Sequence, residues 1–192
     1  MLRAAQLDVD RAFVLVIDLQ EKLLPLIPRR EPIIRAVKKL LDGVRIFHLP
    51  VLATEQYAKG LGPTDSPIRV HLGTTNSAII EKLTFSACGQ GSVRDAIRSI
   101  DRPQVLIVGI ETHICVLQTT LDLITMDYDV FVCADAVGSR GRLDHDVALD
   151  RMRQEGAFVT TVESALFELC TRCDTDEFKK MLDLIKASPP HD

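Results

Sequence analysis

The sequence has no tryptophan, few aromatic residues, and no hydrophobic run of membrane-spanning length. A transmembrane helix needs about 20 consecutive apolar residues, so a membrane protein is not expected. The N-terminal stretch MLRAAQLDVDR also lacks the apolar core of a signal peptide. Five cysteines, an odd number in a chain of 192 residues, argue against a disulfide framework and for a reducing compartment. We therefore expect a cytoplasmic protein.

An excess of basic charge is absent as well. The net charge is −4 at pH 7, and the basic residues are scattered along the chain. Neither nucleic acid nor an anionic membrane surface is expected as a partner, because both attract clustered positive charge. The five histidines show no metal-ligand spacing, so we expect no metal site. His71 lies in a loop where it could contribute to a site, but a single histidine cannot hold a metal ion.

What the sequence does contain is an alternation of apolar strands and amphipathic helices. One predicted helix carries Ile33, Val37 and Leu40 on a single face. Strands that are apolar throughout are typical of a parallel sheet covered by helices on both faces. We expect one domain over residues 1–192 of the α/β class, a three-layer α/β/α, Rossmann-like fold with a six-stranded, mostly parallel sheet. Strands are predicted at 13–17, 51–54, 77–83, 105–108, 128–133 and 157–160, and a long loop at 58–77.

Two polar residues are predicted to follow neighbouring strands of this sheet. Ligand sites in such folds form beyond the carboxyl ends of the strands, where the strand order reverses. With the order 3-2-1-4-5-6, the first and fourth strands are neighbours at that point. Asp18 ends the first strand and Cys115 follows the fourth, so the topology would bring them together. The first strand is followed by DLQEKLLP, without a glycine fingerprint, so no nicotinamide or flavin cofactor is expected.

Cys115 is the candidate nucleophile. It lies in the stretch VLIVGIETHICVLQ, where Thr112 is predicted to cap a helix after a buried strand. In the first turn of that helix, free backbone N–H groups and the helix dipole would favour a thiolate. The alternative is that Cys115 is a small apolar packing residue. Cys170 and Cys173 form a lone C-x-x-C pair, which we interpret as surface or packing cysteines.

Three motifs in this order resemble those of the isochorismatase-like cysteine hydrolases. They are Asp18 after a buried strand, Lys82 before Thr84-Phe85-Ser86-Ala87, and the run from Gly109 to Val116, and Asp135-Ala136-Val137 matches a further family run. The resemblance covers roughly residues 11 to 165. Within the family, Thr54-Glu55-Gln56-Tyr57 and Glu111-Thr112-His113 are most similar to the isochorismatase domain-containing subgroup.

The resemblance implies a catalytic triad of Asp18, Lys82 and Cys115. Cys115 would attack a carbonyl or similar carbon, Asp18 would take the thiol proton, and Lys82 would stay cationic and orient Asp18. A cis peptide bond between Ile110 and Glu111 is also implied. The backbone amides of Glu111 and Cys115 would then form an oxyanion hole. The candidate pocket residues are Gln20, Tyr57, Phe85 and His113.

These expectations describe a small-molecule hydrolase that cleaves an amide or related C–N bond by acyl transfer, without metal or organic cofactor. Relatives in this family are commonly oligomers, so a homo-oligomer is expected. Two other functions stay open. One is a metal-assisted nicotinamidase-type amidase, although Glu55-Gln56-Tyr57 stands where that branch carries a His-x-His-like element. The other is a catalytically idle oligomeric binding module.

Overall fold

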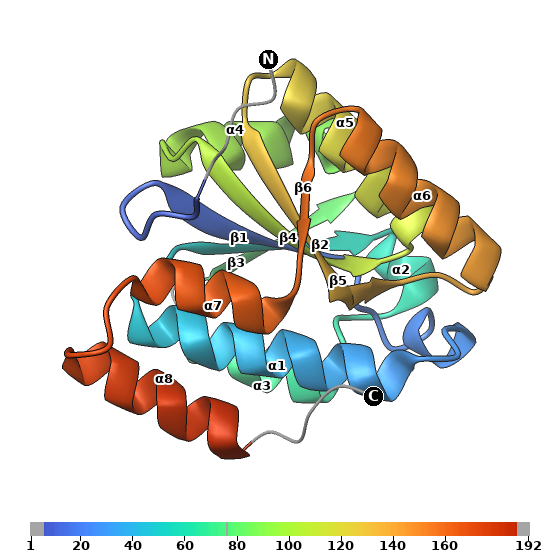
Figure 1. Cartoon of the computed structure of the whole chain (residues 1–192). Helices are drawn as coiled ribbons and strands as arrows, with labels where there is room; N and C mark the ends of the chain where they lie inside the picture. The colour runs from blue at the N-terminus through green and yellow to red at the C-terminus, as the bar shows by residue number, and fades with distance from the viewer. Residues whose placement is uncertain (1–5, 76, 188–192) are drawn as a thin grey trace.

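In the computed structural model, which describes residues 6–75 and 77–187, the chain forms a central sheet between two layers of helices (Figure 1). The sheet has six strands in the order β3-β2-β1-β4-β5-β6, and every pairing is parallel. The predicted fold class and strand order are therefore confirmed. The strands are β1 (Ala12–Ile17), β2 (Val51–Gln56), β3 (Ser77–Lys82), β4 (Gln104–Ile110), β5 (Asp129–Gly138) and β6 (Phe158–Thr160).

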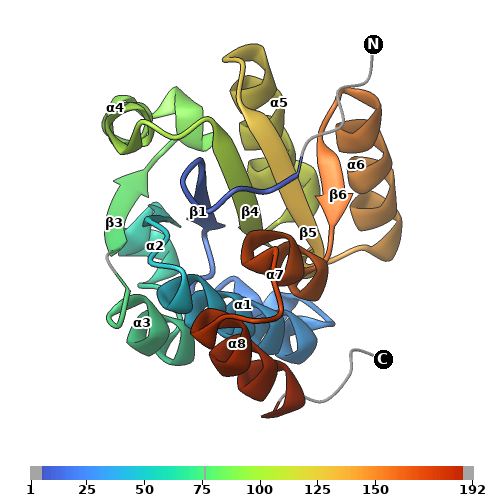
Figure 2. The same cartoon turned by 60° about the vertical axis from the view of Figure 1, so that its left-hand side comes forward.

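The helices divide between the two faces of the sheet, with α1, α3, α7 and α8 on one side and α4, α5 and α6 on the other (Figure 2). Short segments η1 (Leu24–Leu26), η2 (Ala87–Gly89) and η3 (Thr112–Val116) add single turns, and η3 is a π-helix. The helices are α1 (Arg30–Ile46), α2 (Ala58–Leu61), α3 (Ser66–Leu72), α4 (Gly91–Ile100), α5 (Leu117–Thr125), α6 (Arg142–Gln154), α7 (Val162–Cys170) and α8 (Asp176–Ala187).

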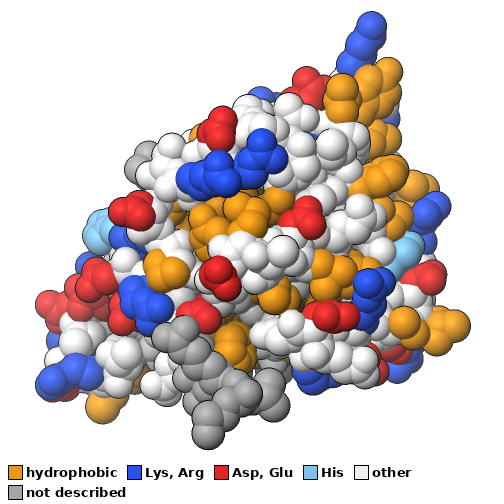
Figure 3. Space-filling view, turned by 90° about the horizontal axis from the view of Figure 1, so that it is seen from above, with side chains coloured by type: hydrophobic (Ala, Val, Ile, Leu, Met, Phe, Trp, Pro, Cys, Tyr) orange, Lys and Arg blue, Asp and Glu red, His pale blue; other side chains and the backbone are white. Residues whose placement is uncertain are grey.

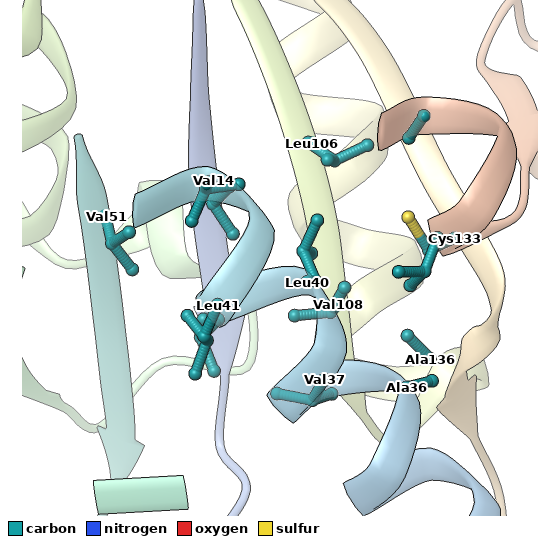
Figure 4. Close-up of a cluster of buried hydrophobic side chains, with 14 of the residues drawn as sticks. Val14, Ala36, Val37, Leu40, Leu41, Val51, Leu106, Val108, Cys133 and Ala136 are labelled. Atoms are coloured by element: carbon teal, nitrogen blue, oxygen red, sulfur yellow. The ribbon is translucent and has the colours of Figure 1, made fainter. Parts of the chain in front are cut away.

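The side chains of β1 show how the sheet is buried on both faces. Successive residues of a strand point to opposite faces, so Val14 and Val16 join the core under α1. Phe13 and Leu15 join the second core, on the opposite face. The first of these cores is drawn in Figure 4, where Leu40 and Leu41 of α1 lie over the strands. Because both faces of β1 are apolar and each is covered by a layer of helices, the sheet lies in the middle of the molecule.

The expectation of a structureless loop over residues 58–77 is wrong, because this stretch contains α2 and α3. Helix α3 has proline in its first turn, a position that proline tolerates. Its residues Ile68 and Leu72, four positions apart, are buried in the core under α1. The glycines and prolines that favoured a loop therefore start and end short helices.

Gly109 allows β4 to pass close to β1. Its φ is +128°, and a Cβ at this position would stand 2.1 Å from the carbonyl oxygen of Ile17. Only glycine fits such a close approach of two backbones. Asp18, which follows Ile17, therefore lies beside the turn that leaves β4. Within residues 6–75 and 77–187, no helix is long and apolar enough to cross a membrane.

Candidate active site

A buried ion pair connects the ends of β1 and β3. Lys82 Nζ lies 2.7 Å from Asp18 Oδ2, and both side chains are fully buried. Burying two charges is costly unless they neutralise each other and gain further hydrogen bonds. The polar neighbours of each charge therefore show how this arrangement is stabilised.

The ammonium group of Lys82 is surrounded by protein acceptors. It donates to Gln56 Oε1 at 2.7 Å and to the carbonyl oxygens of Thr84 and Phe85 at 3.1 Å each, while its contact with Asp18 is an ion pair. An ammonium has three N–H donors, and these three acceptors take all of them. Lys82 therefore has no donor to spare for a ligand, and it acts on its surroundings through its charge.

Asp18 is fixed by the neighbouring strand β2. Thr54 Oγ1 donates to Asp18 Oδ1 at 2.8 Å, and the Asp18 backbone N–H donates to the Thr54 carbonyl at 3.1 Å. The φ of Asp18 is +52°, a left-handed conformation that aspartate tolerates. Our sequence analysis did not identify Thr54 or Gln56 as site residues. Both residues are polar, lie at the end of an apolar strand and are two positions apart, so they point to the same face. This pattern could have identified them from the sequence.

Cys115 completes this cluster. Its side chain is 7% exposed, and Asp18 and Lys82 both lie close enough to the sulfur to affect its pKa. Burial and the charge of Asp18 raise the pKa of the Cys115 thiol to about 12, while the charge of Lys82 lowers it. The structure thus brings the three predicted residues together.

The expectation that the start of a helix stabilises a Cys115 thiolate is wrong. Because burial is the largest effect on its pKa, the thiol is protonated at neutral pH. Thr112 is not the N-cap either. Glu111 occupies that position without a side-chain cap, and the turn that follows is π-helical. The Thr112 hydroxyl is instead 2.9 Å from His145 Nδ1.

The turn before Cys115 is held by residues that follow β5. The peptide bond between Ile110 and Glu111 is cis. The Glu111 carboxylate accepts from the backbone N–H of Arg140 at 2.9 Å and from Arg140 Nε at 3.1 Å. His113 Nδ1 lies 2.9 Å from Ser139 Oγ. Glu111, Thr112 and His113 are therefore each held by a contact with the segment from β5 to α6.

The other candidate pocket residues differ in exposure. Gln20 is fully buried, and its amide pairs with the backbone of Gln56 and donates to the Gly62 carbonyl. Tyr57 is 48% exposed and Phe85 is 57% exposed, so both side chains are accessible to a ligand. His71 lies on α3, where Nδ1 contacts the Pro67 carbonyl and Nε2 is 3.6 Å from Asp42.

No metal-binding cluster is found in the part of the chain that the structure describes, where no three His, Cys, Asp or Glu residues could hold an ion. All five cysteines are free thiols. Cys170 is 8% exposed and donates to the Arg172 carbonyl, while Cys173 is exposed. The C-x-x-C pair thus consists of one packing and one surface cysteine, as predicted.

The fold and this site define a class of protein, a doubly wound α/β hydrolase. The chain belongs to the isochorismatase domain family, whose model matches residues 12–164. It is 36% identical over 186 residues to the secreted isochorismatase effector Isc1 of Phytophthora sojae, covering 96% of this chain and 89% of that protein.

Solved structures are similar over nearly the whole chain. The MAR1 ribonuclease of Caenorhabditis elegans has a TM-score of 0.91 and 37% identity, covering 97% of this chain and 95% of its own. YcaC from Pseudomonas aeruginosa, determined with covalent acrylamide, has a TM-score of 0.86 and 27% identity over 96% and 98% of the chains. YcaC from Escherichia coli, an octameric hydrolase of unknown specificity, has a TM-score of 0.85 and 26% identity, covering 96% of this chain and 97% of its own.

Replacing Lys82 with methionine is expected to lower the free energy of unfolding by about 3–5 kcal/mol, because Asp18 would be left as an unpaired buried charge. Urea denaturation measures this loss. The double variant Asp18→Asn/Lys82→Met should recover much of it, since it removes both charges. Lys59→Met, at an exposed lysine, is the control. A loss no greater than that of the control would contradict the ion pair described above.

Proposed function

We propose that this protein is a cysteine hydrolase that cleaves an amide or related C–N bond in a small molecule by acyl transfer. The observation that carries the proposal is the contact of the Cys115 thiol with the buried pair of Asp18 and Lys82. A packing cysteine needs no ion pair beside it, whereas a nucleophilic thiol needs a base. Acyl transfer is favoured over vinyl-ether hydrolysis, because the latter does not need a nucleophilic cysteine.

The chemistry follows from the protonated state of the thiol. As the Cys115 sulfur attacks the carbonyl carbon, Asp18 takes the thiol proton, so no free thiolate has to form first. The charge of Lys82 stabilises the negative charge that passes from Asp18 to the sulfur as the proton is transferred. The negative oxygen of the tetrahedral intermediate would be bound by the backbone amides of Glu111 and Cys115.

Collapse of this intermediate breaks the C–N bond. Asp18 returns the proton to the departing nitrogen, which leaves as ammonia or an amine, and a thioester remains on Cys115. Water then attacks the thioester while Asp18 accepts one of its protons. That proton passes to the sulfur as the acid product leaves, so the thiol and the Asp18 carboxylate are both restored.

The similar proteins support a reactive thiol more directly than an RNA substrate. Acrylamide is an electrophile that alkylates thiols, and it is covalently bound in YcaC from Pseudomonas aeruginosa. The likeness to a MAR1 ribonuclease raises RNA as an alternative substrate. RNA binding requires clustered positive charge, however, and this chain has a net charge of −4. On the face shown in Figure 3, basic and acidic side chains are interspersed.

A panel of small amides, ureas and carbamates, assayed for ammonia or amine release, tests the proposal. Substrates should leave a covalent adduct on Cys115, detected by rapid quenching, intact-mass spectrometry and peptide mapping. A single-stranded RNA belongs in the same panel. RNA cleavage that survives in Cys115→Ala, with no amide turned over, would overturn the proposal in favour of a nuclease.

Exhaustive chelation is expected to leave the activity unchanged, because the proposed steps use only Asp18, Lys82 and backbone amides to stabilise charge. The measurement is turnover before and after dialysis against a strong chelator, with elemental analysis of the protein. Activity that disappears with a stoichiometric metal and returns on its addition would favour the metal-assisted amidase instead.

We further propose that the chain forms a homo-oligomer in the cytoplasm. The octameric E. coli YcaC supports the assembly, and free cysteines favour a reducing compartment, although the similar Isc1 is secreted. Sedimentation velocity at micromolar concentration should show a species larger than the 21.3 kDa chain. A single monomeric species at that concentration would contradict the assembly.

A further inference from the structure

A cavity of about 340 Å³ opens at the carboxyl edge of the sheet, between the segment before α1 and the segment from β5 to α6. Its lining does not include Asp18, Lys82 or Cys115. Ile27, Ile33 and Val137 give it an apolar floor, and each of them is at most 3% exposed. A volume of this size accommodates a small organic molecule.

One wall of the cavity is shared with the turn that precedes Cys115. Ser139, Arg140 and His145 line the cavity, and they are the residues that contact His113, Glu111 and Thr112, respectively. A ligand that changes the position of these three side chains would therefore act on the turn whose amides belong to the proposed oxyanion hole.

The charges around the cavity favour an anion. Both carboxylates of the lining already have partners, since Asp135 accepts from the Val162 backbone N–H at 2.9 Å and Asp146 pairs with Arg142 at 3.5 Å. The guanidinium of Arg29, by contrast, has no hydrogen-bond or ion-pair partner among residues 6–75 and 77–187. Its charge acts on His145, whose pKa is lowered mainly by burial and further by Arg29. Because Arg29 is exposed, a ligand carboxylate could pair with its guanidinium and also compete with Glu111 for Arg140.

We propose that this cavity binds a small organic anion, a carboxylate on an apolar ring or chain, and that its occupancy alters the reactivity of Cys115. Arg29 recognises the carboxylate, and the floor holds the apolar part. Ser139, Arg140 and His145, which line the cavity and contact the turn, transmit the effect of the ligand to Cys115. The binding itself is independent of the proposed function, whereas the effect on Cys115 rests on it.

Calorimetric titration with benzoate, and with benzyl alcohol as its uncharged counterpart, tests the binding. Benzoate should bind about tenfold more tightly than the alcohol, and Arg29→Met should remove this advantage, as expected for a charged hydrogen bond. Arg45→Met is the matched control, because Arg45 is an exposed arginine in the last turn of α1, the helix that follows Arg29. Equal binding of benzoate to wild type and Arg29→Met would overturn the site.

The rate of Cys115 alkylation by acrylamide, with and without saturating benzoate, tests the coupling. Wild type and Arg45→Met should show a change of about fivefold or more, and Arg29→Met should show none. An unchanged rate in wild type, or equal protection in Arg29→Met, would overturn the coupling. If Cys115 resists acrylamide in every variant, the proposed function fails, while the calorimetry still decides whether the cavity binds the anion.

Discussion

Replacing Cys115 with alanine is expected to reduce turnover by a factor on the order of 10⁴ or more while leaving the protein folded. In the proposed mechanism the thiol forms the covalent intermediate, and its removal leaves Asp18 and Lys82 paired. Initial rates on any substrate found in the panel measure the loss. Circular dichroism and thermal unfolding show whether the fold is retained.

Cys88 offers a matched control for this substitution. It is also buried, and burial raises its pKa to about 12, as for Cys115. Cys88→Ala should therefore remove a buried thiol, as Cys115→Ala does, but leave turnover unchanged. Because the three site residues act as one unit, Cys115→Ala combined with Asp18→Ala should be little worse than either change alone. Near-normal turnover in Cys115→Ala, or multiplied losses in the double variant, would remove the triad from the mechanism.

Changing Asp18 to asparagine is expected to lower both the pKa of the Cys115 thiol and the turnover of the enzyme. The carboxylate raises the pKa of the thiol, whereas Lys82 lowers it. Removing the carboxylate leaves only burial to oppose the effect of Lys82, so the pKa of Cys115 should fall below about 12. Turnover should nevertheless drop by about 10²–10⁴-fold, because the base that takes the thiol proton and returns it is gone.

The thiolate is measured by its ultraviolet absorbance during a pH titration. Asp18→Asn/Cys115→Ala serves as the reference, which subtracts the other cysteines and the tyrosines. Lower activity without a lower thiol pKa would indicate that the substitution disturbs the site rather than removing a charge beside the thiol. A thiol pKa that rises in Asp18→Asn, or turnover that is retained, would show that Asp18 is not the base.

The sheet could be predicted because most of its strands contain apolar runs that alternate with helices, which is typical of a parallel sheet covered on both faces. The short helices α2 and α3 could not, because glycines and prolines at their ends produce the composition of a loop. Helix α3 is buried because Ile68 and Leu72 pack against α1. A helix of seven residues is too short for its apolar spacing to predict this packing.

The strand ends that carry the site residues could be predicted from the sequence, but the protonation state of Cys115 could not. The positions of Asp18 and Cys115 follow from topology, and that of Lys82 followed from the family resemblance. The protonation state of the thiol depends on burial in the second core and on a neighbouring carboxylate, and neither can be read from a local motif. The roles of Thr54 and Gln56 likewise depend on contacts between strands that are distant in sequence.

Strand β3 lies at the edge of the sheet and pairs with β2 alone, yet it supplies Lys82. An edge strand is released more readily than a central one, because one row of hydrogen bonds is lost rather than two. Local opening of β3 would withdraw the ammonium from Asp18 while β1, β4 and β5 stay folded. Backbone amides of β3 should therefore exchange with solvent hydrogen sooner than those of β1. The proposed site would then lose the charge of Lys82 in a partial opening that leaves most of the native core intact.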